Sequence, residues 1–324
     1  MEMLAKDDFQ LIRSWVYRIA RPIETALWNY HFENGDKEAV LTALSAYQNA
    51  DGGFGHALEA DNWNPNSSPA TTGFAIGILE EIHFDDKQHP ILQGILKYIT
   101  STAGLYEKGW PWSVPSNNDY AHASWYTYDA GNKDAYLELT SIELAFFAVR
   151  HADEKSEIYK KAAMLMESSI LKSTNDMEDD FFTISAYCKV IKKIEQSELV
   201  SRFEITTMKE NLTKLVNTHM ERDPAKWSGW CGRPSSFIES PDSKYYKGNE
   251  DIMSEELDWQ LEKIIGRLSE YNVWNVNANG WYWFDNNQGG EYPMESFVSA
   301  NCWEIIDMIK YIKLFKNFGR MDFN

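Results

Sequence analysis

The chain has 324 residues and a formal net charge of −18, with 49 acidic against 31 basic side chains. This length suffices for one large core or two modest ones, and a 44% hydrophobic fraction that includes 13 Trp excludes an intrinsically disordered chain. The acidic balance argues against nucleic acids and anionic membrane surfaces as partners, because both attract basic patches.

Targeting and redox signals are sparse. The first residues lack the basic region and apolar run of a secretion signal, and no stretch approaches the roughly 18 uninterrupted apolar residues of a membrane span. The three cysteines, Cys188, Cys231 and Cys302, lie far apart and form no disulfide framework, which is typical of a reducing compartment. We expect a cytoplasmic protein without a membrane span, and the sequence is compatible with either a monomer or a dimer.

Helical periodicity accounts for most of the chain. Apolar residues recur at spacings of three and four, as in the segment that contains Ile184, Tyr187 and Ile191. Sustained alternation of the strand type is scarce. In chain order, helices are predicted near residues 9–33, 36–48, 69–83, 89–101, 135–150, 156–171, 177–195, 205–220, 257–268 and 298–312. The sequence therefore predicts an all-α fold.

The connections between helices alternate between short and long. Short connections at 84–88 and 151–154 suit antiparallel neighbours. The long connections, near 104–133, 223–250 and 273–292, are rich in Gly, Trp, Tyr, Asn and Pro. A glycine followed by an aromatic residue recurs at 53–54, 109–110, 229–230 and 280–281. This recurrence favours repeated helix pairs, while a non-repeating helical domain with aromatic loops is the alternative.

The segment from Gln48 to Gly55, the Gln48 turn, is the most informative local pattern. Its three glycines allow the chain to reverse through positive φ. Gln48 can offer its side-chain amide to unpaired backbone groups at the adjoining helix ends, and we expect Phe54 to shield that amide. Ser68 is a suitable N-cap and Pro69 a suitable first residue for the next helix.

The spacing of a Gln, three residues, Gly, any residue and an aromatic resembles the repeat of squalene–hopene cyclases and protein prenyltransferase β subunits. That superfamily usually has Trp where this chain has Phe54, and the other Gly–aromatic turns lack the Gln. The resemblance is strongest over about residues 40–85. It implies a single domain over residues 1–324: an α/α toroid of paired antiparallel helices, with long aromatic-rich loops at one rim and a central cavity.

The resemblance also implies a reaction. Class II terpenoid cyclases protonate an isoprenoid alkene with a carboxylic acid from an Asp-rich motif and guide the carbocation along aromatic walls. Residues 176–183 are similar to that motif, although Met177 stands where its first Asp belongs. On this interpretation Asp179 is the proton donor, supported by Asp180 and Asp176. The alternative is that these carboxylates cap the following helix and complement its dipole.

A second acidic group follows the Gln48 turn. Here Glu59 and Asp61 could flank a polar substrate, with His56 as a proton shuttle. Alternatively, they cap helix ends and bind loop amides. We expect the pocket itself to be lined by aromatic residues near helix starts after the long loops: Trp110, Trp112, Trp125, Tyr126, Trp230, Trp281 and Trp283.

The sequence predicts no metal and no cofactor. The close Asp and Cys that bind zinc in protein prenyltransferases have no counterpart, and neither His-Glu-x-x-His nor paired Cys-x-x-Cys occurs. The glycines of the Gln48 turn follow a helix rather than a strand, so they do not form a nucleotide-binding loop.

Three classes of function are open. The first two require a small-molecule ligand, and the third does not. The resemblance implies an acid-initiated transformation of an isoprenoid-like substrate in a central aromatic-lined cavity. A carbohydrate-active or sugar-binding toroid is the second, because Trp and Tyr stack on sugar faces and paired carboxylates perform acid–base chemistry. The third is a non-catalytic binding scaffold. A closed apolar hollow with one buried carboxylate would favour the first, and an open groove with Trp platforms the second.

Overall fold

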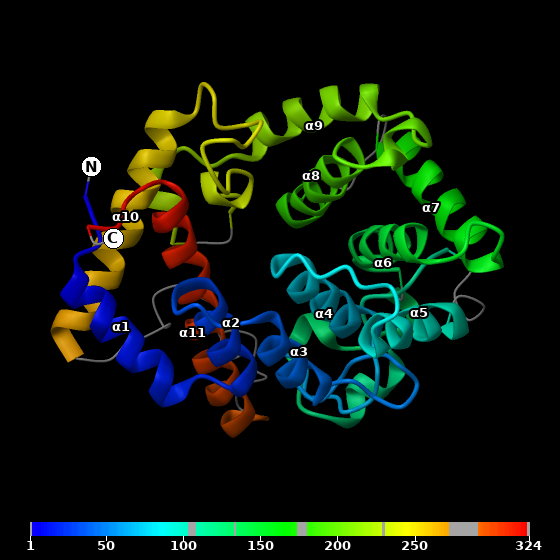
Figure 1. The fold of residues 1–324 in the computed structure, drawn as a ribbon, viewed down its shortest axis with the longest axis horizontal. Coiled ribbons are helices and arrows are strands. Elements are labelled where there is room, and N and C mark those ends of the chain that lie inside the picture. Colours follow the sequence, from blue (N-terminus) through cyan, green and yellow to red (C-terminus); the bar gives the residue numbers. More distant parts are fainter. Residues whose placement is uncertain are drawn as a thin grey trace. The chain divides into compact units, whose positions relative to one another are not determined.

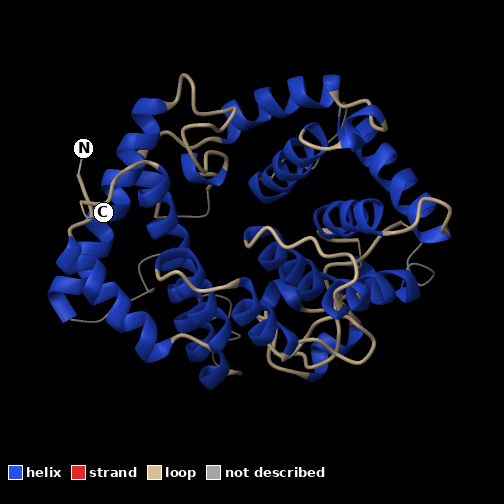
Figure 2. Ribbon diagram, viewed as in Figure 1, coloured by secondary structure: helices blue, strands red, loops and turns tan. Residues whose placement is uncertain are grey.

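The computed structural model describes residues 2–102, 108–132, 134–173, 180–228, 231–271 and 291–322. Within these ranges the regular structure is helical, and the only β-type pairings are isolated bridges (Figures 1 and 2). The all-α prediction is therefore confirmed. None of the described helices combines the length and the apolarity needed to cross a lipid bilayer.

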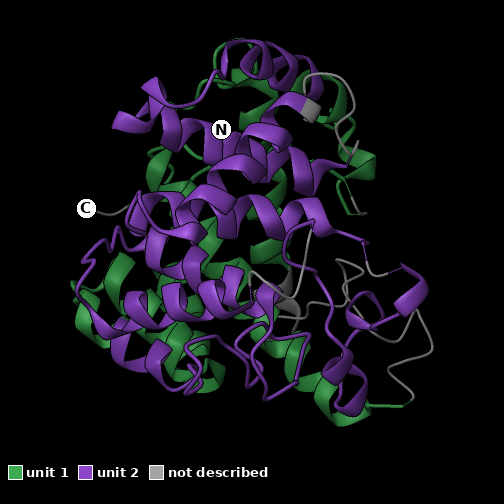
Figure 3. Cartoon of the chain, turned by 90° about the vertical axis from the view of Figure 1, so that its right-hand side faces the viewer, with its two compact units in different colours: residues 1–40, 216–324 green, residues 41–215 purple. Residues whose placement is uncertain are grey.

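The chain divides into two compact units, which Figure 3 distinguishes by colour. Unit 1 combines residues 1–40 with residues 216–324, and unit 2 comprises residues 41–215. Each unit contains its own set of packed helices. The single-domain interpretation and the toroidal arrangement of the helices stay predictions.

Unit 1 is built around the last long helix of the chain, which contacts the other three long helices of the unit. These four helices are α1 (Lys6–Ile19), α2 (Pro22–Phe32), α10 (Glu250–Tyr271) and α11 (Pro293–Asn317). The segment predicted as one helix over 9–33 is divided, since Ala20 and Arg21 are extended. The break arises because Pro22 has no backbone N–H and disfavours helical geometry in the residue before it.

Unit 2 contains the remaining helices of the described residues, and the repetition of helix pairs stays a prediction. Its helices are α3 (Lys37–Ser45), α4 (Pro69–Glu81), α5 (Pro90–Thr102), α6 (Leu137–His151), α7 (Glu157–Ser173), α8 (Phe181–Glu195) and α9 (Thr206–His219), of which α3 and α9 extend across the unit boundaries. Helix α6 packs against α4, α5, α7 and α8. Helix α6 therefore adjoins both α4 and α8 (Figure 1).

The Gln48 turn follows α3 in the chain and contacts the start of α5. The Nε2 of Gln48 donates hydrogen bonds to the backbone oxygens of Gly52 at 2.9 Å and of Ile91, in the first turn of α5, at 3.1 Å. Gly52 has a φ of +95° and lies directly against Gly94 of α5. The side-chain amide thus links the turn to α5 through two backbone carbonyls, neither of which is an unpaired group of a helix end.

The start of α4 also follows local rules. Ser68 is its N-cap, with Oγ accepting a hydrogen bond from the backbone N of Thr71 at 3.2 Å, and Pro69 is its first residue. Phe54 is buried and its backbone N donates to Oγ1 of Thr72 in α4 at 3.1 Å. The turn therefore fixes α3, α4 and α5 with respect to one another.

Candidate functional site

Of the predicted Asp-rich motif, the structure describes one member. Asp180 is the N-cap of α8, and its Oδ1 accepts hydrogen bonds from the backbone N of Phe182 at 2.9 Å and of Thr183 at 3.0 Å. The capping alternative thus accounts for this carboxylate. Asp176 and Asp179 lie outside the described residues, and a catalytic role for the motif stays a prediction.

The predicted aromatic lining is described only in part, since Trp230, Trp281 and Trp283 lie outside the described residues. Trp110 is fully buried, and its backbone N donates to Oγ of Ser141 in α6 at 2.9 Å. Its indole Nε1 donates to Oγ1 of Thr102 in α5 at 3.2 Å. Trp110 therefore anchors its loop to two helices of unit 2.

Other predicted residues meet in one cluster, Glu59, Asp61 and Tyr126, which we term the carboxyl–phenol cluster. Glu59 is 5% exposed, and Asp61 and Tyr126 are each 2% exposed. Burial, the two neighbouring negative charges and a hydrogen bond with Glu59 raise the pKa of the Tyr126 phenol well above its ordinary value. The backbone N of Asp61 donates to Oε2 of Glu59 at 3.0 Å. The structure thus brings both predicted carboxylates and one predicted aromatic together.

Pairing between two loops positions this cluster. The backbone N of Ala123 donates to O of Asp61, and the backbone N of Trp63 donates to O of Ala121, both at 2.9 Å. Asn117 is buried beside them, and its Nδ2 donates to the backbone O of Tyr126 at 2.9 Å. These contacts join loops that are distant in sequence. Glu59 binds a loop amide, as the alternative predicts, and a substrate-binding role for Glu59 and Asp61 stays a prediction.

His56 is not part of this cluster. Its side chain is exposed, its φ is +57°, and its Nε2 lies 2.9 Å from Oδ1 of Asn49. The left-handed backbone of His56 and of Ala57, which has the same φ, directs the chain away from the Gln48 turn toward Glu59. The proton-shuttle role of His56 stays a prediction.

A carboxylic acid that sequence reasoning missed lies between α4, α6 and α8. Burial raises the pKa of Glu143 in α6 to about 7, against the lowering effect of Lys189 and Lys193 in α8. The negative charge of Glu80 in α4 raises it further. Its Oε2 is 3.3 Å from the position that a Cβ on Gly73 of α4 would occupy. A carboxyl with this pKa can hold a proton at neutral pH and release it to a reacting group.

The surroundings of Glu143 combine open space with charge. Gly77, one turn beyond Gly73 on α4, is exposed and has no atom within 4 Å of the position of a Cβ, whereas Gly73 is buried against Glu143. Glu80 forms an ion pair with Lys193, whose Nζ lies 5.8 Å from the ring centroid of Phe146. The sequence signal for this site is a lone carboxyl in the apolar run 142–149, together with two glycines one helical turn apart on α4.

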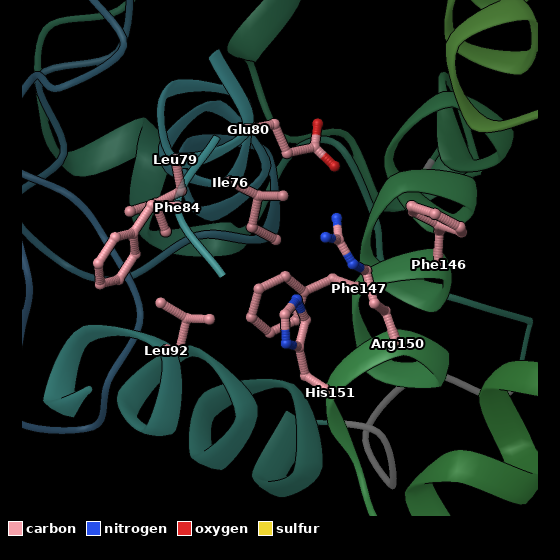
Figure 4. Close-up of a pocket in the computed structure, with 9 residues that line it drawn as sticks. All are labelled: Ile76, Leu79, Glu80, Phe84, Leu92, Phe146, Phe147, Arg150 and His151. Atoms are coloured by element: carbon pink, nitrogen blue, oxygen red, sulfur yellow. The ribbon is translucent and has the colours of Figure 1, made fainter. Parts of the chain in front are cut away.

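A small apolar pocket adjoins this site and shares Glu80 and Phe146 with it (Figure 4). In Figure 4, the imidazole of His151 lies beside the ring of Phe147, and Leu92 of α5 faces them. The pocket is lined by Ile76, Leu79, Glu80, Phe84, Leu92, Phe146, Phe147, Arg150 and His151.

His151 is a buried titratable group in this pocket. Its side chain is 7% exposed, and Nδ1 lies 3.6 Å from Oδ1 of Asp85, which also pairs with Nη2 of Arg150 at 2.6 Å. Desolvation lowers the pKa of His151 to about 4, although Asp85 acts in the opposite direction. The imidazole is therefore neutral at physiological pH.

The burial of the His151 imidazole predicts that the protein loses stability at acidic pH. In the unfolded chain His151 is protonated near its ordinary pKa of 6.5, and in the folded chain only near 4. The free energy of unfolding therefore has its full value above pH 6.5 and decreases as the pH falls toward 4. The loss is about 2 kcal/mol. Chemical denaturation between pH 4 and 8 measures it. His151→Gln should remove this part of the pH dependence, whereas His56→Asn, at an exposed position, should retain it.

In the described parts of the chain, no group of three or more His, Cys, Asp and Glu side chains is placed to hold a metal ion. Comparison with known proteins gives no assignment either: no protein-family model matches the sequence, and neither the curated proteins nor the solved structures contain a match.

Proposed function

We propose that unit 2 binds an isoprenoid-like small molecule on α4 beside Gly77 and that Glu143 initiates its transformation by donating a proton. The observation that carries this proposal is the position of Glu143, whose carboxyl lies against Gly73 of α4 and near Lys189 and Lys193 of α8. Burial there raises its pKa to about 7, whereas an ordinary glutamate is almost fully ionised at neutral pH. A glutamate that keeps its proton at working pH is the group that acid-initiated alkene chemistry requires.

The neighbouring residues suit this chemistry. Protonation adds hydrogen to one carbon of the alkene and leaves a cation on the other, which then closes a ring or loses a proton to a base. Lys189 and Lys193 would stabilise the Glu143 carboxylate that remains. Buried apolar side chains of α6 next to Glu143, including Leu144 and Phe146, provide an apolar surface beside the acid. The acid and the apolar surface thus come from α6 and the counter-charge from the adjoining α8.

Glu143→Gln tests the proposal, because it keeps the shape of the side chain and removes the acid. Purified protein is incubated with C10 to C20 isoprenoid alcohols and diphosphates and with squalene, and products are identified by gas chromatography and mass spectrometry. We expect turnover by the wild type to fall as pH rises through 7, and Glu143→Gln to lose about 100-fold or more of it. Binding, followed by thermal stabilisation, should persist in the variant.

Glu157→Gln is the matched control, since Glu157 is an exposed glutamate in the first turn of α7. It should retain full activity. Full turnover by Glu143→Gln would contradict the proposal, as would stabilisation of the wild type by oligosaccharides and by no isoprenoid. An Asp179→Asn variant measured in parallel tests the role implied by the resemblance: unchanged turnover would exclude Asp179 as the proton donor.

A further inference from the structure

Three aromatic rings from separate segments form a stack on the loops that precede α6. The indole of Trp112 lies parallel to the ring of Tyr126, with centroids 5.0 Å apart and an interplanar angle of 12°. Tyr136 also packs against Trp112, with ring centroids 5.7 Å apart and an interplanar angle of 55°. Tyr126 is buried, Trp112 is half-buried and Tyr136 is 44% exposed. We term the two accessible rings, Trp112 and Tyr136, the aromatic ledge.

The ledge rests on a fixed base. The Nε1 of Trp112 donates to the backbone O of Trp125 at 3.0 Å, which sets the plane of the indole. Beneath it, Tyr126 is held by its hydrogen bond with Glu59 and by the bond from Asn117 to its backbone O. Because the bond to Trp125 and the stack on Tyr126 fix the indole, the accessible part of Trp112 is oriented before any ligand binds.

Tyr136 adopts a backbone conformation that its side chain disfavours. It is the N-cap of α6, with φ of +53° and ψ of 19°, and its side chain makes no capping hydrogen bond. A bulky residue in the left-handed region costs on the order of 1–3 kcal/mol, and glycine or asparagine would avoid most of that cost. Helix capping therefore does not explain a tyrosine here, whereas an exposed ring held against Trp112 does.

Two charged side chains are close in sequence to the rings of the ledge. Lys108 precedes the loop that carries Trp112, and Asp134 precedes Tyr136; their side chains form an exposed ion pair at 2.6 Å. The apolar C–H face of a pyranose packs on an aromatic ring, while its hydroxyls need charged or polar partners. Two rings match one or two sugar units and are far smaller than a stable protein interface, which needs about 800 Å² per partner.

We infer that the aromatic ledge is a carbohydrate-binding site, separate from the Glu143 site. The sugar face packs on Trp112 and Tyr136, and its hydroxyls bond to Lys108 and Asp134. The site does not require catalysis, and it does not depend on the proposed isoprenoid chemistry.

Isothermal titration calorimetry with cellotetraose, maltotetraose, xylotetraose and chitotetraose tests this inference. We expect at least one of them to bind the wild type with a millimolar or lower Kd. Tyr136→Gly should weaken that binding by about tenfold. The same variant should fold at least as stably as the wild type, because glycine adopts a φ of +53° without strain, so lost affinity cannot be attributed to unfolding.

Tyr120→Ala is the matched control. Tyr120 is an exposed tyrosine of the same loop, 39% accessible, and lies outside the stack. It should leave the sugar affinity unchanged, and so should Glu143→Gln, which separates this site from the proposed catalytic one. Absence of binding by all four sugars, or unaltered binding by Tyr136→Gly, would overturn the inference.

Discussion

Gly52→Ala is expected to lower the free energy of unfolding by at least about 3 kcal/mol. Two effects add. At a φ of +95° any side chain is strained, and a Cβ at this position would lie 2.0 Å from the backbone O of Gly94. Relief of that overlap requires the Gln48 turn and α5 to separate, which breaks the hydrogen bond from Gln48 to Ile91. Urea denaturation followed by circular dichroism gives the measurement.

Gly77→Ala serves as the control for glycine replacement in the same unit. Gly77 lies inside α4, and a Cβ there meets no atom within 4 Å. We expect this variant to be more stable than the wild type by about 0.5–1 kcal/mol, because alanine favours the helix. If Gly52→Ala were as stable as the wild type, the close approach of the turn to α5 would be wrong.

Arg233→Met is expected to destabilise unit 1 by about 3–5 kcal/mol, because it leaves a buried carboxylate without its cation. Glu256 of α10 is fully buried, and its oxygens accept from the backbone N of Ser235 at 2.7 Å and from its Oγ at 2.6 Å. Arg233 Nε lies 3.7 Å from Oε1 of Glu256. Its Nη1 and Nη2 donate to the backbone O of Trp227 at 2.7 Å and to the hydroxyl of Tyr311 at 3.1 Å.

The destabilisation caused by Arg233→Met should depend on pH. Burial raises the pKa of Glu256 even with Arg233 present, and removal of the cation raises it further. A carboxyl whose folded pKa is raised contributes stability at low pH and loses it as pH rises, so Arg233→Met should be least harmful at acidic pH. The double variant Arg233→Met/Glu256→Gln, which has no buried charge, should recover much of the loss.

Lys160→Met is the control for loss of a cation. Lys160 pairs with Glu157 at 2.7 Å on the exposed side of α7, where such a pair contributes less than about 0.5 kcal/mol. Guanidinium denaturation at pH 5 and pH 8 compares the three variants. An Arg233→Met protein no less stable than Lys160→Met would show that the buried pair does not hold the loop to α10 and α11.

The amino-acid sequence determined the local features of this protein. Helical periodicity, the glycines of the Gln48 turn, the Ser68 cap and Pro69 at the start of α4 were all predictable, because each depends on hydrogen bonds and sterics within a few residues. Even the break at Pro22, which the periodicity concealed, follows from a local rule.

Only the tertiary structure decided which side chains meet and which become buried. The carboxyl–phenol cluster joins Glu59 to Tyr126 across two loops. Glu143 acquires its pKa of about 7 only when α4 and α8 pack around it and exclude water. The desolvation of a group and the charges around it depend on its whole environment, which is formed by residues far apart in the chain. Backbone geometry, in contrast, depends on residues within one helical turn.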